Sequence, residues 1–516
     1  MKLTWHYLAT AFVTTALLVG CGDEDSPDPG SGFSSTTYQF YQGLSTSSHA
    51  SLNALDPANP GSPILVEPDS SVLHSSRHTI THGTFNSTTK VITDNLPYAV
   101  IYAKTDGKLY RVSARKSGSL SPVQVSSETN ANQMCQSHSA ADRSNPDHSQ
   151  FVYSLHGADG NCSAAGDNIW KMVRLGMGNS EHPVPALPPV VNIGNSSGGI
   201  SGWLVNNAGE LQQCDQNFLN CTLPSIIGTL PDSVVDTVRV PGYFDLIANR
   251  FLLNINENVL ATYDGNTQTL TPLFETSTIG QTLTFTPVTD KRNVYFSYNK
   301  NLFRLAADGS TGHLLATDAA TPDHIQLTAN RVIYRSATGI GIASKDATGI
   351  NNTIVAIRPG TASYHFVSGT NIYYTTLTAS TVTAGSIDEN GNNHTTYSDA
   401  AWIGVLLPTT LDLKNAPGVL TEPARIILAH GMSGNGFSGA TLTQYDAATR
   451  SAIRNLGALR SGSNLSTIFC SGQVGNILCD ANFSGPAQSD IFFANTEAAN
   501  SLQQITNTPD KFESSL

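Results

Sequence analysis

The sequence predicts an all-β fold built from repeated four-stranded sheets, and three observations support this prediction. Short runs of alternating apolar and polar residues, separated by turn residues, recur along the chain after about residue 36. Gly, Ser, Thr and Asn are abundant, while only 13% of the residues are charged. No long stretch with the 3.6-residue periodicity of a helix follows the first twenty residues.

The segment Thr282–Asp318 shows the repeated unit most clearly. It contains the runs TLTFTPV, NVYFSY, LFRLAADG and HLLATD, and the third run ends in Asp308-Gly309, a pair typical of hairpin turns. Similar units begin near residues 98, 250, 330, 370, 424 and 476. Repeats of about 40–50 residues with four strands each are typical of a β-propeller, in which sheets stack radially around an axis. The main alternative is an array of β-sandwiches, which would show Greek-key pairings instead of one repeated up-and-down unit.

The number of units sets the expected size of the ring. About ten candidate units occur, whereas propellers typically have four to eight blades. We therefore expect a single ring of about eight four-stranded blades, with a range of seven to ten, over residues 36–516. The proline-rich segment His182–Gly199 is the best candidate for a boundary between two rings, but the units continue through it without a long linker.

Two short segments resemble known propellers. Leu302–Ser310, LFRLAADGS, is similar to the strand-and-turn segment of TolB-like and WD40-like bacterial propellers. Gln503–Leu516 resembles the join at which an outer strand leads into the next inner strand. The SPDG turn typical of TolB-like repeats is missing. The resemblance implies a propeller architecture for most of residues 36–516, and it carries no catalytic residue.

The two ends of this region predict how the ring closes. Ser35–Pro68 supplies three strand runs, TYQFYQ, SLNALDP and PILVE, but no innermost strand precedes them. Phe512–Leu516 follows the last unit and has no unit of its own. We expect Phe512–Leu516 to pair with TYQFYQ as the innermost strand of the first blade, because this pairing removes two free sheet edges.

The first twenty residues have the pattern of a bacterial signal peptide. A positive Lys2 precedes the apolar run Leu8–Val19, which is too short to span a bilayer. The sequence Leu18-Val19-Gly20-Cys21 resembles a lipobox, although an ordinary signal with a chance cysteine is the alternative. The resemblance implies cleavage after residue 20 and lipidation of the Cys21 thiol.

The residue after Cys21 and the segment that follows extend this interpretation. Residue 22 is Gly, and the resemblance to lipoproteins then favours the outer membrane of a Gram-negative cell envelope over retention at the inner membrane. The stretch GDEDSPDPGSG has no apolar residue to bury. Residues 21–35 are therefore expected to form a flexible tether between the membrane and the propeller.

Six further cysteines agree with export to an oxidising compartment. They form three pairs of near neighbours, for which we predict the disulfide bonds Cys135–Cys162, Cys214–Cys221 and Cys470–Cys479. Buried free thiols or a metal site are the alternatives. The spacings of the two closer pairs do not match the short spacing typical of zinc ligands.

Two motifs suggest chemistry but lack the context that it needs. RIILAHGMSGNG (Arg425–Gly436) resembles the strand and His-Gly turn of α/β-hydrolases, yet no nucleophile elbow follows it. His74, His78 and His82 are four residues apart, which in a strand separates them by about 13 Å and prevents them from sharing one ion. The sequence predicts no catalytic residue, no metal site and no cofactor.

Charge and architecture limit the function classes. The formal net charge is −12 and no run of Lys and Arg occurs, which argues against a nucleic-acid partner. We expect a lipid-anchored, non-enzymatic binding or scaffolding propeller with a protein or glycan partner. The alternative is a secreted lyase or hydrolase acting on polysaccharide. Histidines or acids that meet at the ring axis would favour this enzyme, whereas an axis lined only by Ser, Thr, Asn and Gly would disfavour it.

Overall fold

The computed structural model describes the chain between residues 36 and 515. Its gaps are residues 45–49, 72–76, 87, 127–133, 141–149, 156–168, 175–181, 184–191, 197–198, 206–210, 215–220, 227–237, 246–249, 256–257, 277–286, 319, 321, 357–361, 378–381, 413–422, 432–439, 460–463, 474, 485–487 and 507–512. The described residues form 42 strands and no helix. The all-β prediction is therefore confirmed.

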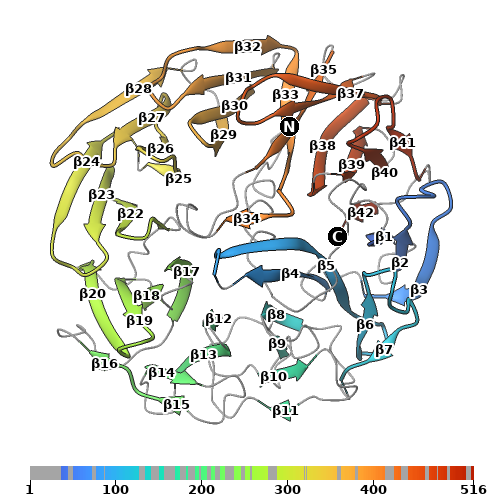
Figure 1. The fold of residues 1–516 in the computed structure, drawn as a ribbon, viewed down its shortest axis with the longest axis horizontal. Helices are drawn as coiled ribbons and strands as arrows, with labels where there is room; N and C mark the ends of the chain where they lie inside the picture. The colour runs from blue at the N-terminus through green and yellow to red at the C-terminus, as the bar shows by residue number, and fades with distance from the viewer. Residues whose placement is uncertain are drawn as a thin grey trace.

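The strands form ten four-stranded units, which we call blades 1 to 10 in chain order. Nine sheets are present, and the eight-stranded one consists of two four-stranded halves. These halves meet at a single bridge between Gly404 and Cys470, where a Cβ on Gly404 would lie only 2.5 Å from the Cys470 carbonyl oxygen. The blades follow one another around one ring (Figure 1), so the chain is a β-propeller.

The first five blades in chain order have these strands, given from the axis outward. Blade 1 contains β42 (Glu513–Ser515), β1 (Gln39–Leu44), β2 (Ala50–Leu55) and β3 (Ile64–Ser70). Blade 2 contains β4 (Arg77–Asn86), β5 (Val91–Ala103), β6 (Leu109–Ser113) and β7 (Val123–Gln124). Blade 3 contains β8 (Met134–Ala140), β9 (Gln150–Leu155), β10 (Ile169–Arg174) and β11 (His182–Pro183). Blade 4 contains β12 (Asn192–Ser196), β13 (Gly199–Val205), β14 (Leu211–Cys214) and β15 (Cys221–Thr222). Blade 5 contains β17 (Val238–Asp245), β18 (Arg250–Ile255), β19 (Val259–Asp264) and β20 (Thr269–Glu275), to which β16 (Ser225–Ile226) adds in parallel.

The remaining five blades have the same order. Blade 6 contains β21 (Val288–Thr289), β22 (Asn293–Tyr298), β23 (Asn301–Ala306) and β24 (Gly312–Thr317). Blade 7 contains β25 (Asp323–Leu327), β26 (Arg331–Arg335), β27 (Gly339–Ser344) and β28 (Asn352–Ala356). Blade 8 contains β29 (Ala362–Ser368), β30 (Asn371–Leu377), β31 (Val382–Asp388) and β32 (Thr395–Ser398). Blade 9 contains β33 (Ala400–Leu406), β35 (Arg425–His430), β36 (Thr441–Asp446) and β37 (Ala452–Ala458), and blade 10 contains β38 (Asn464–Gln473), β39 (Asn476–Ser484), β40 (Gln488–Asn495) and β41 (Gln503–Gln504).

The number of blades and the order of their strands distinguish a propeller from an array of β-sandwiches. Ten blades lie at the upper limit of the expected seven to ten, above the central value of eight. Successive strands within the blades pair in up-and-down order, which agrees with the propeller and not with Greek-key sandwiches. The candidate boundary at residues 182–199 runs from β11, the outer strand of blade 3, to β12 and β13 of blade 4, and both blades belong to the same ring (Figure 1).

The ring closes through the pairing that the two ends of the sequence predict. β42 pairs antiparallel with β1, with Tyr41 opposite Ser515 and Gly43 opposite Glu513. The closure is supported by an apolar cluster in which Tyr41 and Leu55 of blade 1 pack with Leu478, Ile491 and Phe493 of blade 10. The first and last blades therefore share both a sheet and a core.

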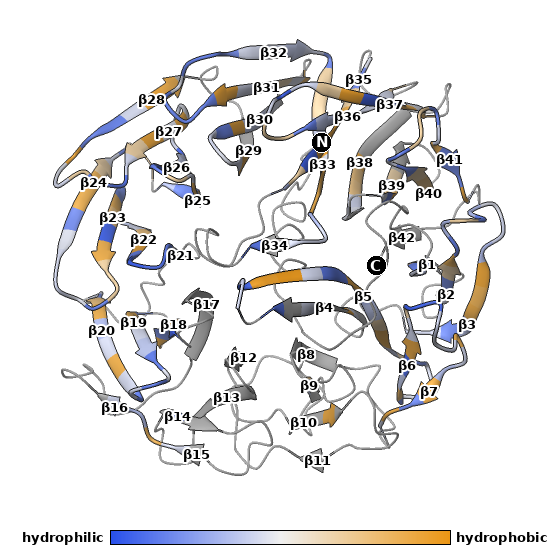
Figure 2. Cartoon of the chain, viewed as in Figure 1, coloured by the Kyte–Doolittle hydropathy of each residue, from blue (hydrophilic) through white to orange (hydrophobic). Residues whose placement is uncertain are grey.

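The cores lie between neighbouring blades. Phe40 and Leu52 of blade 1, for example, pack in one cluster with Val100, Tyr102 and Val112 of blade 2. Apolar stretches alternate with polar ones along the strands, as β3 and β5 illustrate in Figure 2. Each sheet thus buries its two faces against the adjacent blades, which explains why a single blade would not be stable alone.

Aspartate side chains close the turns between the third and fourth strands of several blades. The Asp446 carboxylate, at the end of β36, accepts hydrogen bonds from the backbone N–H groups of Ala448 and Thr449 at 2.9 and 2.7 Å. Asp264 and Asp388 form comparable turns at the same place in blades 5 and 8. These turns follow from Asp itself, because its short side chain bonds backbone N–H groups two or three residues further on.

The same turns contact the preceding blade through buried polar groups. Lys345, after β27, lies 3.8 Å from the Asp290 carboxylate of blade 6. Glu389, after β31, accepts a hydrogen bond of 2.8 Å from the Asn330 side chain of blade 7. Lys345 and Glu389 are both buried, so the partners compensate for the loss of hydration. We assign these residues to the stability of the ring.

Candidate functional site at the ring axis

A long hairpin from blade 2 crosses the centre of the ring (Figure 1). β4 has ten residues and β5 has thirteen, whereas most other strands have five to seven. The root of β5 pairs with β6 inside the blade, and its first residues extend beyond the blade toward the axis. Gly83 permits the close approach of the two strands, since a Cβ there would lie 2.6 Å from the Thr93 carbonyl oxygen.

A segment from blade 9 fixes the far end of this hairpin. β34 (Leu411–Asp412), which lies between β33 and β35 in the chain, pairs antiparallel with β5 at Val91 and Ile92. The backbone N–H of Asn95 also donates to the Thr409 carbonyl oxygen at 3.0 Å. Because Ile92 and Thr409 are buried, this junction is part of the folded core. The hairpin is therefore held at both ends across the ring.

The tip of the hairpin presents hydroxyl and amide groups. Asn86 accepts hydrogen bonds from the backbone N–H groups of Thr88 and Thr89, both at 2.9 Å, and this turn fixes the loop. Thr88, Thr89 and Thr93 are exposed, as is Thr84 on the other strand. Hydroxyl groups both donate and accept hydrogen bonds, so this surface is suited to polar, uncharged ligand groups.

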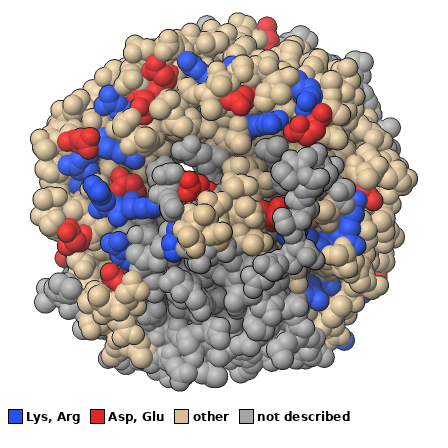
Figure 3. Space-filling view, viewed as in Figure 1, with Lys and Arg blue, Asp and Glu red and all other residues tan. Residues whose placement is uncertain are grey.

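Charged side chains are distributed unevenly over the face that Figure 3 shows. Lys and Arg are most concentrated at the left of that view, over blades 6 and 7, where Asp and Glu are interspersed. A hollow is visible near the centre of the face. The described part of this face therefore has no large region of one sign that would bind a strongly charged polymer.

A second polar cluster lies on the innermost strands of blades 7 and 8 and on the adjacent strand β26. Asp323 and His324 belong to β25, His365 belongs to β29, and Arg335 ends β26. The Arg335 Nε atom donates to Asp323 Oδ1 at 2.5 Å, and a second guanidinium nitrogen pairs with Oδ2. The rings of His324 and His365 are 6.4 Å apart between centroids and nearly perpendicular, at 77°.

The environment lowers the pKa of both imidazoles, which favours their neutral forms. Burial lowers the pKa of His365 to about 3, and the nearby His324 and Arg335 act in the same direction. Burial also lowers the pKa of His324, and Arg335 adds to this effect while Asp323 opposes it. Neutral imidazoles can accept a proton or coordinate a metal ion. Among the described residues, no group of three or more His, Cys, Asp and Glu side chains is arranged to hold a metal ion.

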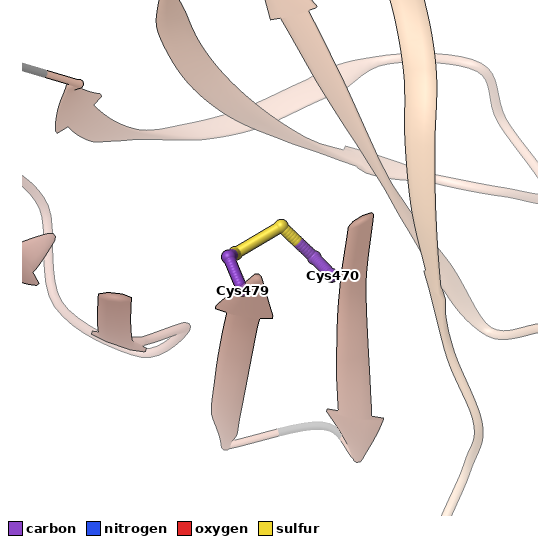
Figure 4. The surroundings of a disulfide bond; sticks show 2 residues. All are labelled: Cys470 and Cys479. Atoms are coloured by element: carbon purple, nitrogen blue, oxygen red, sulfur yellow. A yellow bond between two sulfur atoms is a disulfide. The ribbon is translucent and has the colours of Figure 1, made fainter. Parts of the chain in front are cut away.

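The predicted cysteine sites have different outcomes. A disulfide bond joins Cys470 and Cys479, which lie opposite each other in β38 and β39 (Figure 4). The backbones of Cys214 and Cys221 are also directly opposite, in β14 and β15, but their bond remains a prediction. Cys135 is in β8, whereas Cys162 lies outside the described residues, as does the predicted lipidation site Cys21. Nothing in the described part of the chain is a helix of the length and apolarity that crossing a membrane requires.

The motifs that resembled catalytic or metal sites belong to blade strands. Arg425–His430 is β35, and the glycine-rich segment after it connects β35 to its antiparallel partner β36. His78 and His82 lie in strand β4, as a strand reading of their spacing requires, while His74 is outside the described residues.

Sequence reasoning missed both polar features of the axis. The hairpin had a detectable signal, since two alternating runs, residues 77–86 and 91–103, flank one polar turn and are longer than the other runs. The cluster of Asp323, His324, Arg335 and His365 had none, because its members come from three strands and form no local motif.

The ring of four-stranded blades makes this protein a β-propeller, and the β4–β5 hairpin crosses its axis. No protein-family model and no curated protein matches the sequence. Among solved structures, the chain is similar to dihydro-heme d1 dehydrogenase NirN in complex with DHE, with 13% identity, a TM-score of 0.36 and coverage of 85% of this chain and 76% of NirN. It is also similar to apo AztD from Citrobacter koseri, with 13% identity, a TM-score of 0.32 and coverage of 63% and 96%.

A third similar structure is PorZ, a surface component of the type-IX secretion system of Porphyromonas gingivalis. It has 10% identity, a TM-score of 0.27 and coverage of 91% of this chain and 59% of PorZ. At these TM-scores and identities the similarities carry no functional inference. The function proposed below depends on the sequence and on the geometry of this chain.

Proposed function

We propose that this protein is a lipid-anchored protein of the bacterial cell envelope that binds a protein or glycan partner at the ring axis without catalysing a reaction. The observation that carries the proposal is the hairpin β4–β5, which presents exposed threonine hydroxyls at the axis and is fixed there by β34. A fixed loop loses little conformational entropy on binding, which favours recognition.

The proposed location depends on two features of the cysteines. Cys21 follows a short apolar run in a sequence that resembles a lipobox. The Cys470–Cys479 disulfide agrees with an oxidising compartment, because such bonds are rare where thiols are kept reduced. Lipidated Cys21 would place the ring at the outer membrane, separated from it by the tether of residues 21–35.

The anchor is tested by replacing the thiol that would carry the lipid. Cys21→Ser is expected to release the protein from the membrane fraction or to leave its precursor uncleaved, because stable anchoring needs more than one acyl chain. Metabolic labelling with palmitate should mark the wild type and not the variant. A variant that stays processed, unlabelled and in the membrane fraction would show that the anchor is assigned wrongly.

Binding at the axis is tested with threonines at two places. The double variant Thr88→Ala/Thr89→Ala removes exposed hydroxyls from the hairpin, and Thr395→Ala/Thr396→Ala removes exposed hydroxyls from the outer strand β32. Lipidated protein is used to capture partners from solubilised membranes and from an immobilised glycan array. Capture should be weakened at least about tenfold by the hairpin variant alone, since each lost polar contact costs about 1 kcal/mol. Equal capture by both variants would exclude the hairpin as the binding surface.

One observation favours a second candidate, a lyase or hydrolase acting on polysaccharide. Asp323, His324 and His365 meet on innermost strands, which is the arrangement that an active site at the axis would need. His365 is only 8% exposed, however, so a polymer would reach it only after a rearrangement. Incubation with neutral and acidic polysaccharides, followed by detection of new reducing ends, tests this candidate, and loss of product in His324→Ala would support it.

A further inference from the structure

The first described residues are fixed at the edge of the ring. The backbone N–H of Lys116 donates to the Thr36 carbonyl oxygen at 2.8 Å, and the buried Thr37 forms an antiparallel bridge with the residue before Lys116. These contacts hold the start of blade 1 against residues 114–122, the turn between β6 and β7 of blade 2. The proposed tether of residues 21–35 therefore leaves the ring beside this turn.

This turn contacts the corresponding turn of blade 1. Residues 56–63 connect β2 to β3, and the Asp56 carboxylate in that turn pairs with the Lys116 ammonium group. Both turns join the third strand of a blade to the fourth, so the up-and-down order of the strands places them on the same rim of the ring. We call the two turns and the first two residues of β3 and β7 the exit corner (residues 56–65 and 114–124).

Aliphatic side chains are exposed where the outer strands of the exit corner begin. Ile64 and Leu65 of β3 are 40% and 58% exposed, and Val123 of β7 is 43% exposed. Exposed prolines, Pro63 and Pro122, precede these two short runs. Figure 2 shows apolar stretches of β3 and β7 at the outer boundary of the ring. Exposed apolar side chains that gather on one part of a surface mark sites of contact with proteins or membranes.

The outer strands argue against another β-strand as the occupant of this surface. A partner strand would bind the outer edge of β3 through backbone hydrogen bonds, but Pro68 within β3 has no N–H group to donate. β7 has only two residues, and such short edge strands are a common protection against pairing. The exposed side chains are therefore better suited to an apolar phase that needs no matching hydrogen bonds.

The charge of the exit corner also suits a bilayer surface. Within residues 56–65 and 114–124 the one acidic side chain, Asp56, is paired with Lys116, and Arg115 is a second cation. By contrast, the corresponding turns of blades 8 and 9 begin with Asp388 and Asp446. Anionic lipid headgroups attract Lys and Arg and repel carboxylates. The sector of the rim beside the tether is thus better suited to a membrane than these acidic sectors.

We propose that the exit corner is a membrane-contact site at which Ile64, Leu65 and Val123 enter the headgroup region of the bilayer that holds the tether. This inference rests on the proposed lipid anchor at Cys21. Residues 21–35 span at most about 50 Å when fully extended. The corner beside their exit therefore meets the bilayer more often than the far side of the ring does. The ring then stands with blades 1 and 2 against the membrane.

The test attaches the ring to vesicles without depending on the native anchor. Residues 21–516 are produced with Cys21→Ser and with a histidine tag ahead of residue 21, and they are bound to vesicles of anionic and nickel-chelating lipids. Leu65→Trp and Val123→Trp place reporters in the exit corner. Ile350→Trp is the control, because Ile350 is 61% exposed in the corresponding turn of blade 7, across the ring (Figure 1).

The readout is quenching of tryptophan fluorescence by lipids brominated near the headgroup, which requires contact with the bilayer. The parent protein gives the background of the four native tryptophans. Above this background, we expect quenching in Leu65→Trp and Val123→Trp and none in Ile350→Trp. Equal quenching at the two places, or none at either, would overturn the proposal. Circular dichroism checks folding, and the second corner reporter keeps the test decisive if the first variant does not fold.

Partitioning measures how much the apolar side chains contribute. Without chelating lipid, Leu65→Ser/Val123→Ser should bind anionic vesicles about tenfold more weakly than the parent, because apolar area that enters the bilayer is lost. The matched pair Ile350→Ser/Ile453→Ser, also on outer-strand positions, should bind as the parent does. Equal binding by the two double variants would refute the contact.

Two outcomes separate this inference from the proposals on which it rests. If Cys21 carries no lipid in cells, the anchor is wrong, whereas the quenching still shows whether the exit corner contacts a bilayer, since the tag supplies the attachment. If the parent forms a dimer in solution that Leu65→Ser/Val123→Ser abolishes, the corner binds a second copy of the chain, and the membrane contact is wrong.

Discussion

Gly341 in β27 lies directly beneath the ring of Tyr334, and its replacement by alanine should destabilise the propeller. An added Cβ would lie 2.0 Å from Tyr334 Cζ and within 2.5 Å of both flanking ring carbons, whereas carbon atoms pack best at about 3.5–4.0 Å. The ring is fully buried, and the Tyr334 hydroxyl accepts a hydrogen bond of 2.8 Å from Asn352. Displacing the ring therefore disturbs the core and this bond together.

The expected loss of stability follows from these contacts. Overpacking costs about 1–3 kcal/mol, and the lost hydrogen bond about 1 kcal/mol more. Alanine also reduces the entropy of the unfolded chain, which offsets up to about 1 kcal/mol. We expect Gly341→Ala to lower the free energy of unfolding by roughly 1–3 kcal/mol, measured by urea denaturation monitored by fluorescence and circular dichroism.

A control and a double-mutant cycle make this reasoning refutable. Gly349→Ala introduces the same methyl group where no atom lies within 4 Å, and we expect a change below about 0.5 kcal/mol. In a Tyr334→Ala background the ring is absent, so Gly341→Ala should cost about 1–2 kcal/mol less than in the wild type. Additive effects, or equal stability of the two glycine variants, would refute the argument. Gly385 beneath Tyr374 in blade 8 offers an independent repeat of the experiment.

Three further predictions concern closure, cross-linking and acid stability. Deleting residues 511–516 should lower the melting temperature and promote aggregation, because the edge of β1 is then unpaired. Deleting residues 23–32 should not, and identical melting curves for the two truncations would contradict the closure. Replacing Cys470 and Cys479 with alanine should lower the free energy of unfolding in guanidinium by about 2–3 kcal/mol, because a short loop is no longer cross-linked. A variant as stable as the wild type would show that this bond does not stabilise the fold. Asp446→Ala should lower the free energy of unfolding by about 1 kcal/mol, and Asp446→Asn should lower it less. Hydrogen bonds from Thr449 and Ala448 lower the pKa of Asp446. Its contribution to stability is therefore fully present above the ordinary pKa of aspartate and is lost as the pH falls through the lowered pKa. An acid-unfolding profile unchanged in Asp446→Ala would exclude this role.

The fold was largely predictable, because its signals are local. Alternating runs such as NVYFSY, which is β22, needed only period-two patterning and flanking turns. Closure by residues 513–515 was also predictable, since a unit without an inner strand and a terminal strand without a unit complement each other. The blade count was harder to fix, because degenerate repeats such as β8–β11 have weak patterns. The histidine pair was beyond sequence reasoning, since His324 and His365 are 41 positions apart and meet only when two blades stack.

The pairing of Ser515 with Tyr41 also constrains when this protein can fold. The two residues are separated by almost the whole described chain, so blade 1 stays incomplete until its inner strand has been synthesised. A chain that emerges from the ribosome or from a translocation channel N-terminus first cannot close its ring before residues 513–515 appear. Until then β1 keeps an open edge and the core between blades 1 and 10 is absent. The unpaired edge and the missing core make the incomplete ring a natural client for chaperones.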